Sequence, residues 1–160
     1  MKRCHDPRWR PAVWTLFVAV LDAPSDHKGE GGLGAFRIAP EHAEDVALVI
    51  ADLRRRAPGT PVWLVGTSRG TISAVNAAAR LKPPRAADGL VLTSTLTGRA
   101  PGRNPRPGVA ETVYDVDLGA IRLPALLVYH RADACPRTSP GDVPALQRKL
   151  SAAPQVDTIA

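Results

Sequence analysis

The stretch PVWLVGTSRGTISAVNAAAR, residues 61–80, decides the fold of this chain. Its first part, VWLV at 62–65, is a short apolar run of the kind found in strands buried inside a sheet. Its last part is rich in small residues and predicts a helix over 69–81, which a pair of prolines ends. Between the predicted strand and the predicted helix lies GTSRG, with Ser68 at its centre.

A serine at a sharp turn from strand to helix is held in a strained backbone conformation that projects its hydroxyl. Gly66 and Gly70 stand two residues before and two residues after Ser68. Glycines at these places leave room for a crowded turn. The pattern therefore predicts that Ser68 lies at the carboxyl edge of a parallel sheet, with its hydroxyl presented to solvent.

Strand and helix patterns alternate through the rest of the chain. This alternation implies a parallel sheet covered on both faces, so we expect an α/β fold with three layers, an αβα sandwich. No linker or repeat interrupts residues 1–160, which we expect to form a single domain with an irregular tail at 1–12. The further strands are predicted at 13–21, 89–93, 123–129 and 156–159, and the further helices at 40–56 and 143–150.

Composition excludes several classes of protein. The chain has 160 residues, a hydrophobic fraction of 44% and a net charge of +6. Its positive residues are scattered and only 4% of residues are aromatic, so we expect no nucleic-acid partner. The longest apolar run near the start is too short to cross a membrane and lacks a good cleavage site, so we expect no membrane partner and no signal peptide. Two cysteines without metal-ligand spacing favour a reducing, cytoplasmic setting.

GTSRG in this setting resembles the nucleophile elbow of the α/β-hydrolase family. The likeness extends to DAPSD at 22–26, GLVLTS at 89–94 and LPALLVYHRADAC at 123–135, and it covers roughly residues 13–160. The resemblance implies that Ser68 is the nucleophile and that the backbone N–H of Arg69 is one oxyanion donor. It also implies a hydrolase cut short at both ends, because the family's earlier strands and its histidine-bearing loop have no counterpart here.

The family order of serine, acid and histidine makes Asp133 the expected acid. Asp133 lies four residues beyond the strand at 123–129, with Asp115 or Asp117 as the alternative. No histidine follows Asp133. We expect His42 to be solvated in the first turn of its helix and His5 to lie in the charged tail; His130 is a stand-in base at most. His27, the fourth histidine, also precedes the acid.

The glycine-rich loop GEGGLG at 29–34 admits two further interpretations. It could supply an oxyanion donor, although too few elements separate it from Ser68 for the family order. Its GxGxxG pattern lies away from a strand-to-helix turn, so a nucleotide site is disfavoured, and we expect no cofactor and no metal. Cys135 is expected to be an unreactive loop residue.

The resemblance implies a serine hydrolase that acts on an ester or similar acyl bond of a small-molecule substrate. The alternative is a non-catalytic or truncated hydrolase-fold domain that binds a small molecule or a protein partner. Three arginines, Arg99, Arg103 and Arg106, lie in the loop 98–108 after a predicted strand. If this loop overhangs the site, its charges favour acidic substrates.

Overall fold

The computed structural model describes residues 16–21, 35–100, 102 and 109–160. Four strands form one sheet in the order β1-β2-β3-β4, and every neighbouring pair is parallel. The sequence prediction of a parallel α/β fold is confirmed at this level. The strands are β1 (Trp63–Thr67), β2 (Gly89–Thr93), β3 (Ala125–Val128) and β4 (Val156–Ile159).

The helices agree closely with the ranges predicted from the sequence. Helix α2 (Pro40–Arg56) begins at a proline and ends in three arginines, an arrangement that complements the helix dipole. Helix α3 (Arg69–Arg80) follows β1, and α4 (Val143–Lys149) lies between β3 and β4. Three short 3₁₀ helices complete the described elements: η1 (Val113–Asp115), η2 (Leu118–Ala120) and η3 (Pro140–Asp142).

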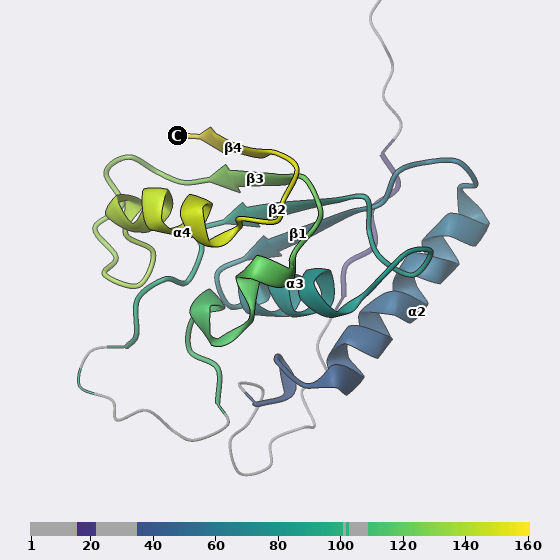
Figure 1. The fold of residues 1–160 in the computed structure, drawn as a ribbon, viewed down its shortest axis with the longest axis horizontal. Coiled ribbons are helices and arrows are strands. Elements are labelled where there is room, and N and C mark those ends of the chain that lie inside the picture. Colours follow the sequence, from purple (N-terminus) through teal and green to yellow (C-terminus); the bar gives the residue numbers. More distant parts are fainter. Residues whose placement is uncertain (1–15, 22–34, 101, 103–108) are drawn as a thin grey trace, which may run out of the picture.

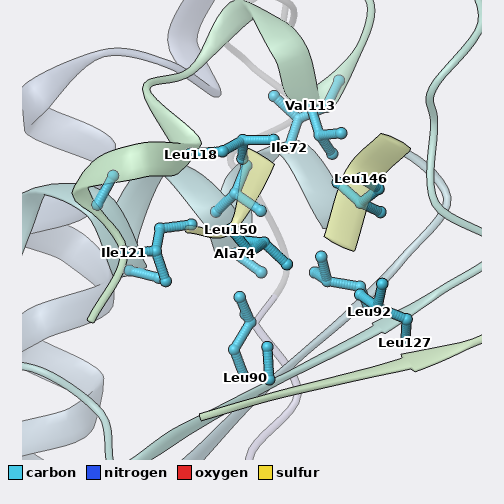
Figure 2. Packing of buried hydrophobic residues seen from close by; sticks show 14 of the residues in the cluster. Ile72, Ala74, Leu90, Leu92, Val113, Leu118, Ile121, Leu127, Leu146 and Leu150 are labelled. Atoms are coloured by element: carbon cyan, nitrogen blue, oxygen red, sulfur yellow. The ribbon is translucent and has the colours of Figure 1, made fainter. Parts of the chain in front are cut away.

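The described helices cover one face of the sheet (Figure 1). Each strand is added beside the one before it, and right-handed crossovers in one direction place all the connecting helices on the same side. The core under these helices contains fully buried residues from the strands, from α3 and from α4 (Figure 2). The labelled members are Ile72, Ala74, Leu90, Leu92, Val113, Leu118, Ile121, Leu127, Leu146 and Leu150.

The opposite face of the sheet is apolar, and no described helix covers it. Val65, Val91 and Leu126 lie side by side across this face, and Val65 is 67% exposed. The ring of Trp63 lies against Gly89, where a Cβ atom would come within 2.4 Å of the indole. The described part of the chain therefore has two layers, and a third layer is not seen in it.

The prediction of a buried strand at 13–21 is wrong for the residues that are described. Residues 16–21 have no regular secondary structure, and Leu16, Val18 and Val20 are exposed. No hydrogen bond joins this segment to β1 or to another described strand. A β-branched run forms a strand when a neighbour accepts its backbone hydrogen bonds, and residues 16–21 have no such neighbour in the part of the chain that the structure describes. The predicted tail at 1–12 lies outside the described residues.

Candidate functional site

Ser68 occupies the turn between β1 and α3, at the carboxyl edge of the sheet. Its backbone has φ 51° and ψ −120°, a region that residues with a side chain rarely adopt. The Ser68 N–H donates to the carbonyl of Thr93 at 3.1 Å, and its carbonyl accepts from the N–H of Thr71 at 3.0 Å. These bonds fix the backbone and leave the side chain at the surface, as the sequence pattern predicts.

Gly66 is required by close packing against α3. A Cβ atom there would lie 2.7 Å from the carbonyl oxygen of Gly70, 2.8 Å from the Cα of Thr71 and 2.9 Å from the Cβ of Ala74. Gly70 differs, because a Cβ built on it meets nothing within 4 Å. The expectation that both glycines make room for the turn therefore applies to Gly66 and not to Gly70.

Gly66→Ala is expected to lower the free energy of unfolding by about 1–3 kcal/mol, the usual cost of forcing extra atoms into a packed site. Gly70→Ala adds the same methyl group in open space, within a helix that favours alanine. Its stability is expected to remain within about 1 kcal/mol of wild type. Urea denaturation of both variants measures the difference. Equal losses in the two variants would contradict the packing described at Gly66.

The backbone N–H of Arg69, the oxyanion donor that the resemblance implies, lies at the start of α3. Arg69 is the first residue of α3, and the first N–H groups of a helix have no acceptor within the helix. The N–H of Thr71 is already used by the carbonyl of Ser68. The partial positive charge at the start of α3 adds to the attraction for developing negative charge.

Asp133 lies on the same edge of the sheet as Ser68, because it follows β3 and β3 runs parallel to β1. One strand separates β1 from β3, so their axes are roughly 10 Å apart. Both carboxylate oxygens of Asp133 are engaged within its own loop, by the N–H of Cys135 at 2.9 Å and the hydroxyl of Thr138 at 2.7 Å. These two donors hold the pKa of Asp133 below its ordinary value.

The alternative acids have structural roles in the short helices. Burial alone would raise the pKa of Asp115, but hydrogen bonds from the N–H groups of Thr112 and Glu111, with Arg99 nearby, lower it below its ordinary value. Asp117 accepts a hydrogen bond from the N–H of Gly119 at the start of η2. The local hydrogen bonds of both carboxylates account for their presence, so neither is needed as the acid at the sheet edge that carries Ser68.

The Nδ1 atom of His130 makes a hydrogen bond that opposes a role as the catalytic base. Its Nδ1 accepts a hydrogen bond from the backbone N–H of Ala132 at 3.2 Å. In a neutral imidazole the proton then resides on Nε2. A triad base needs the reverse arrangement, with Nδ1–H donated to the acid and a free lone pair on Nε2 facing the serine. The sequence expectation that His130 is a poor base has this physical reason.

His42 is buried, so the expectation that it is solvated is wrong. Its residue is 1% exposed, and its ring lies 4.9 Å from the ring of Phe36, centroid to centroid. Neither ring nitrogen has a hydrogen-bond partner within the ranges that the structure describes. Burial lowers the pKa of His42, Arg37 lowers it further, and Asp45 opposes them. His5 and His27 lie outside the described residues.

Acidification is expected to destabilise the fold through His42. Its folded pKa lies below the ordinary 6.5, so the unfolded chain binds more protons between these two values. Stability therefore falls as the pH drops through 6.5 and levels off below the folded pKa. Thermal unfolding measured across this range, for wild type and His42→Leu, tests the effect. The same slope in both proteins would contradict it.

A second serine shares the positive φ of Ser68, although no motif in the sequence marks it. Ser94 follows β2 with φ 44°, and its N–H donates to the carbonyl of Val128 at 3.3 Å. The segment GLVLTS places Ser94 directly after the strand at 89–93. No glycines flank Ser94 as they flank Ser68 in GTSRG, so the sequence does not mark a sharp turn there. Ser94 is a natural comparison for Ser68 at the same edge.

Positive charge gathers near the start of α3. Arg37, Arg69 and Arg137 line a small cavity of about 50 Å³ together with Glu111. Burial lowers the pKa of Arg37, and the neighbouring charge of Arg69 lowers it further. This concentration of positive charge favours an anionic group at the entrance to the site.

The predicted arginine loop, 98–108, contributes less positive charge near the site than the sequence suggests. Arg99 is paired with Asp115 at 3.0 Å and lies 3.9 Å from Glu111. Its charge is therefore largely neutralised by neighbours. Arg103 and Arg106 lie outside the described residues, so the proposed overhang of the loop stays a prediction.

Other expected features are either unremarkable or outside the described residues. Cys135 is exposed, and hydrogen bonds from the Thr138 side chain and the Arg137 backbone lower its pKa. The glycine loop at 29–34 is not described. Among the residues that are, no cluster of metal-ligating side chains occurs. None of the described helices combines the length and the apolar character needed to cross a bilayer.

Comparisons of the chain with protein-family models, with curated proteins and with solved structures found no match. The chemistry of the site therefore rests on the geometry of Ser68 and its neighbours.

Proposed function

We propose that the chain is a serine hydrolase of the α/β-hydrolase type, acting on an ester or similar acyl bond through Ser68. The observation that carries the proposal is the backbone of Ser68, with φ 51° and ψ −120° at the turn from β1 into α3. Such strain persists where surrounding structure holds it, and it concentrates at catalytic turns. The close approach of Gly66 to α3 fits the same interpretation.

In this proposal the Ser68 hydroxyl attacks the acyl carbon. The new bond joins Oγ to that carbon, and the oxyanion that forms accepts a hydrogen bond from the N–H of Arg69. The alcohol then leaves with a proton, and water releases the acyl group from Ser68. Asp133 would orient a histidine between itself and Ser68, and we propose that none of the four histidines of these 160 residues is that base, since all four precede Asp133 and the family order places the base after the acid.

The arginines near α3 suggest which acyl substrates are preferred. Arg37 and Arg69 lie at one small cavity beside the elbow, and they are near enough for the charge of Arg69 to lower the pKa of Arg37. An anionic group on the substrate would relieve this repulsion. We therefore propose that small acyl substrates with a negative charge are favoured over neutral ones.

The alternative is a hydrolase-fold domain that binds a small molecule or a partner without catalysis. The tautomer of His130 favours this alternative, because the described histidines supply no base in the required state. Ester turnover separates the two proposals, since a binding domain would gain nothing from the Ser68 hydroxyl.

Hydrolysis of p-nitrophenyl acetate by wild type, Ser68→Ala and Ser94→Ala tests the proposed function. Ser68→Ala, assayed with added imidazole as the base, is expected to lose the part of the rate that depends on a nucleophile, because none remains at the turn. Ser94→Ala removes an equivalent hydroxyl at the same edge and is expected to keep the wild-type rate. A rate that is unchanged in Ser68→Ala would overturn the proposal.

A further inference from the structure

A cavity of about 590 Å³ lies between residues 16–21 and the outer side of β1. Its walls are formed by β1, α2, α3 and the segment 16–21, and most of the lining side chains are apolar. The members contributed by the helices and β1 include Val46, Val49, Leu53, Leu64, Val65 and Ala74. The lining offers little to a charged group beyond Arg37 and His42.

One wall of this cavity is the open edge of a strand. The N–H of Ser68 donates to Thr93 and the carbonyl of Val62 accepts from Asp88, so the even-numbered residues of β1 face β2. Backbone groups alternate in direction along a strand, so Trp63, Val65 and Thr67 present theirs to the cavity side. No described segment pairs with this edge. An open edge of this kind is a template for another strand.

The opposite wall is a second segment, 16–21, which has no backbone partner in the described ranges of the chain. Residues 16–21 read LFVAVL, carry no charge and are rich in strand-forming side chains. Leu16 is 81% exposed, Val18 74% and Val20 91%. The cavity is therefore bounded on two sides by polypeptide whose hydrogen-bonding groups are unpaired.

A third observation concerns the polar groups in the lining of this cavity. His42 is 1% exposed and lines this cavity, and both of its ring nitrogens lack a partner among the described residues. The Nε of Arg37 is likewise buried and unpaired. Buried polar atoms without partners are rare in stable proteins, so this wall of the cavity is incompletely satisfied in a single copy.

We propose that the cavity accepts a strand from a second copy of this chain, and that the strand is the segment 16–21 of that copy. The segment has the required character, since it is apolar, uncharged and one residue longer than β1. A strand pairs with the backbone edge and fills the apolar walls at once, whereas a small apolar molecule would leave the edge unpaired. The same chain therefore carries both the groove and a segment that fits it.

The exchange closes on itself. The order across the dimer is β1, the partner's segment 16–21, the first copy's own segment 16–21, and then β1 of the partner. Each segment thus lies in the other copy's groove, and a two-fold axis between the two segments makes the contact reciprocal. One sheet would then run continuously through both copies. Because each copy carries a net charge of +6, added salt is expected to strengthen the dimer.

Sedimentation equilibrium of the full chain tests this proposal. Wild type is expected to dimerise, and Val20→Lys is expected to weaken the dimer at least tenfold by placing a charge in the groove. Val20 is 91% exposed within one copy, so the change leaves the fold of that copy intact. Leu48→Lys is the matched control, because Leu48 is 68% exposed on α2 and does not line the cavity. Circular dichroism establishes that both variants are folded.

A cross-linking experiment locates the contact. Val18→Cys and Val65→Cys proteins, each made with Cys4→Ser and Cys135→Ser, are expected to form a mixed disulfide faster than Val65→Cys protein forms one alone, because two inserted segments separate the two copies of β1. A wild-type chain that stays monomeric, a dimer indifferent to Val20→Lys, or a mixed pair that links no faster would each overturn the proposal. Stoichiometric binding of an apolar dye to a monomer would also overturn it, by assigning the groove to small molecules. None of these outcomes depends on Ser68, so they are separate from the test of hydrolysis.

Discussion

Hydrolysis of p-nitrophenyl acetate by the 160-residue chain is expected to exceed the uncatalysed rate by a factor of at most roughly 10³ to 10⁴. This is the rate enhancement that remains when a catalytic triad lacks a member. A serine hydroxyl is a weak nucleophile near neutral pH until a base takes its proton. The described histidines do not supply that base, since His42 is buried and the Nδ1 of His130 accepts a hydrogen bond from Ala132. Free imidazole added to the reaction is expected to raise the protein-dependent rate in proportion to its concentration.

Two variants separate this explanation from its competitors. Ser68→Ala is expected to remove the imidazole-dependent increase, after subtraction of the hydrolysis that imidazole causes alone. His130→Ala is expected to leave the protein-dependent rate unchanged. A high rate without imidazole that disappears in both variants would contradict the account and identify His130 as the base.

Leu127→Ala is expected to cost about 2–5 kcal/mol of unfolding free energy, as is usual for a buried leucine. Leu127 is 1% exposed and belongs to the core beneath α3 and α4. Leu126 is its neighbour on β3 and points to the opposite face, which no described helix covers. Leu126→Ala removes the same atoms and is expected to cost less than half as much, because its side chain is only partly buried.

Urea denaturation of the two variants gives the comparison directly. The adjacent positions share a strand and a residue type, so the difference reports on which face of the sheet is covered. Equal losses would contradict the two-layer arrangement of the described residues and would indicate that the second face is also buried.

The order of elements could be predicted from the sequence because each carries a local signal. Helix α2 has a proline at its start and arginines at its end, and GTSRG marks the turn between β1 and α3. The unusual backbone of Ser68 follows from the same pattern, since a glycine at 66 is what allows α3 to approach the strand. Parallel pairing then brings Ser68 and Asp133 to one edge of the sheet.

Other features depend on contacts between distant segments, and the sequence carries no signal for them. The run at 13–21 has strand-forming residues, but whether it pairs is decided by a neighbour that its own sequence does not specify. His42 reads as a solvated residue of a first helical turn, yet packing against Phe36 buries it. The coverage of a single sheet face likewise follows from crossover direction, which local periodicity does not encode.

The central claim is that Ser68 is the nucleophile, and the most direct measurement is the site of covalent labelling. The full chain is treated with a fluorophosphonate in the presence of imidazole, and the modified residue is located by peptide mass spectrometry. The account predicts one adduct on Ser68, its loss in Ser68→Ala, and its retention in Ser94→Ala. An adduct on Ser94, or labelling of Ser68→Ala equal to that of wild type, would contradict it.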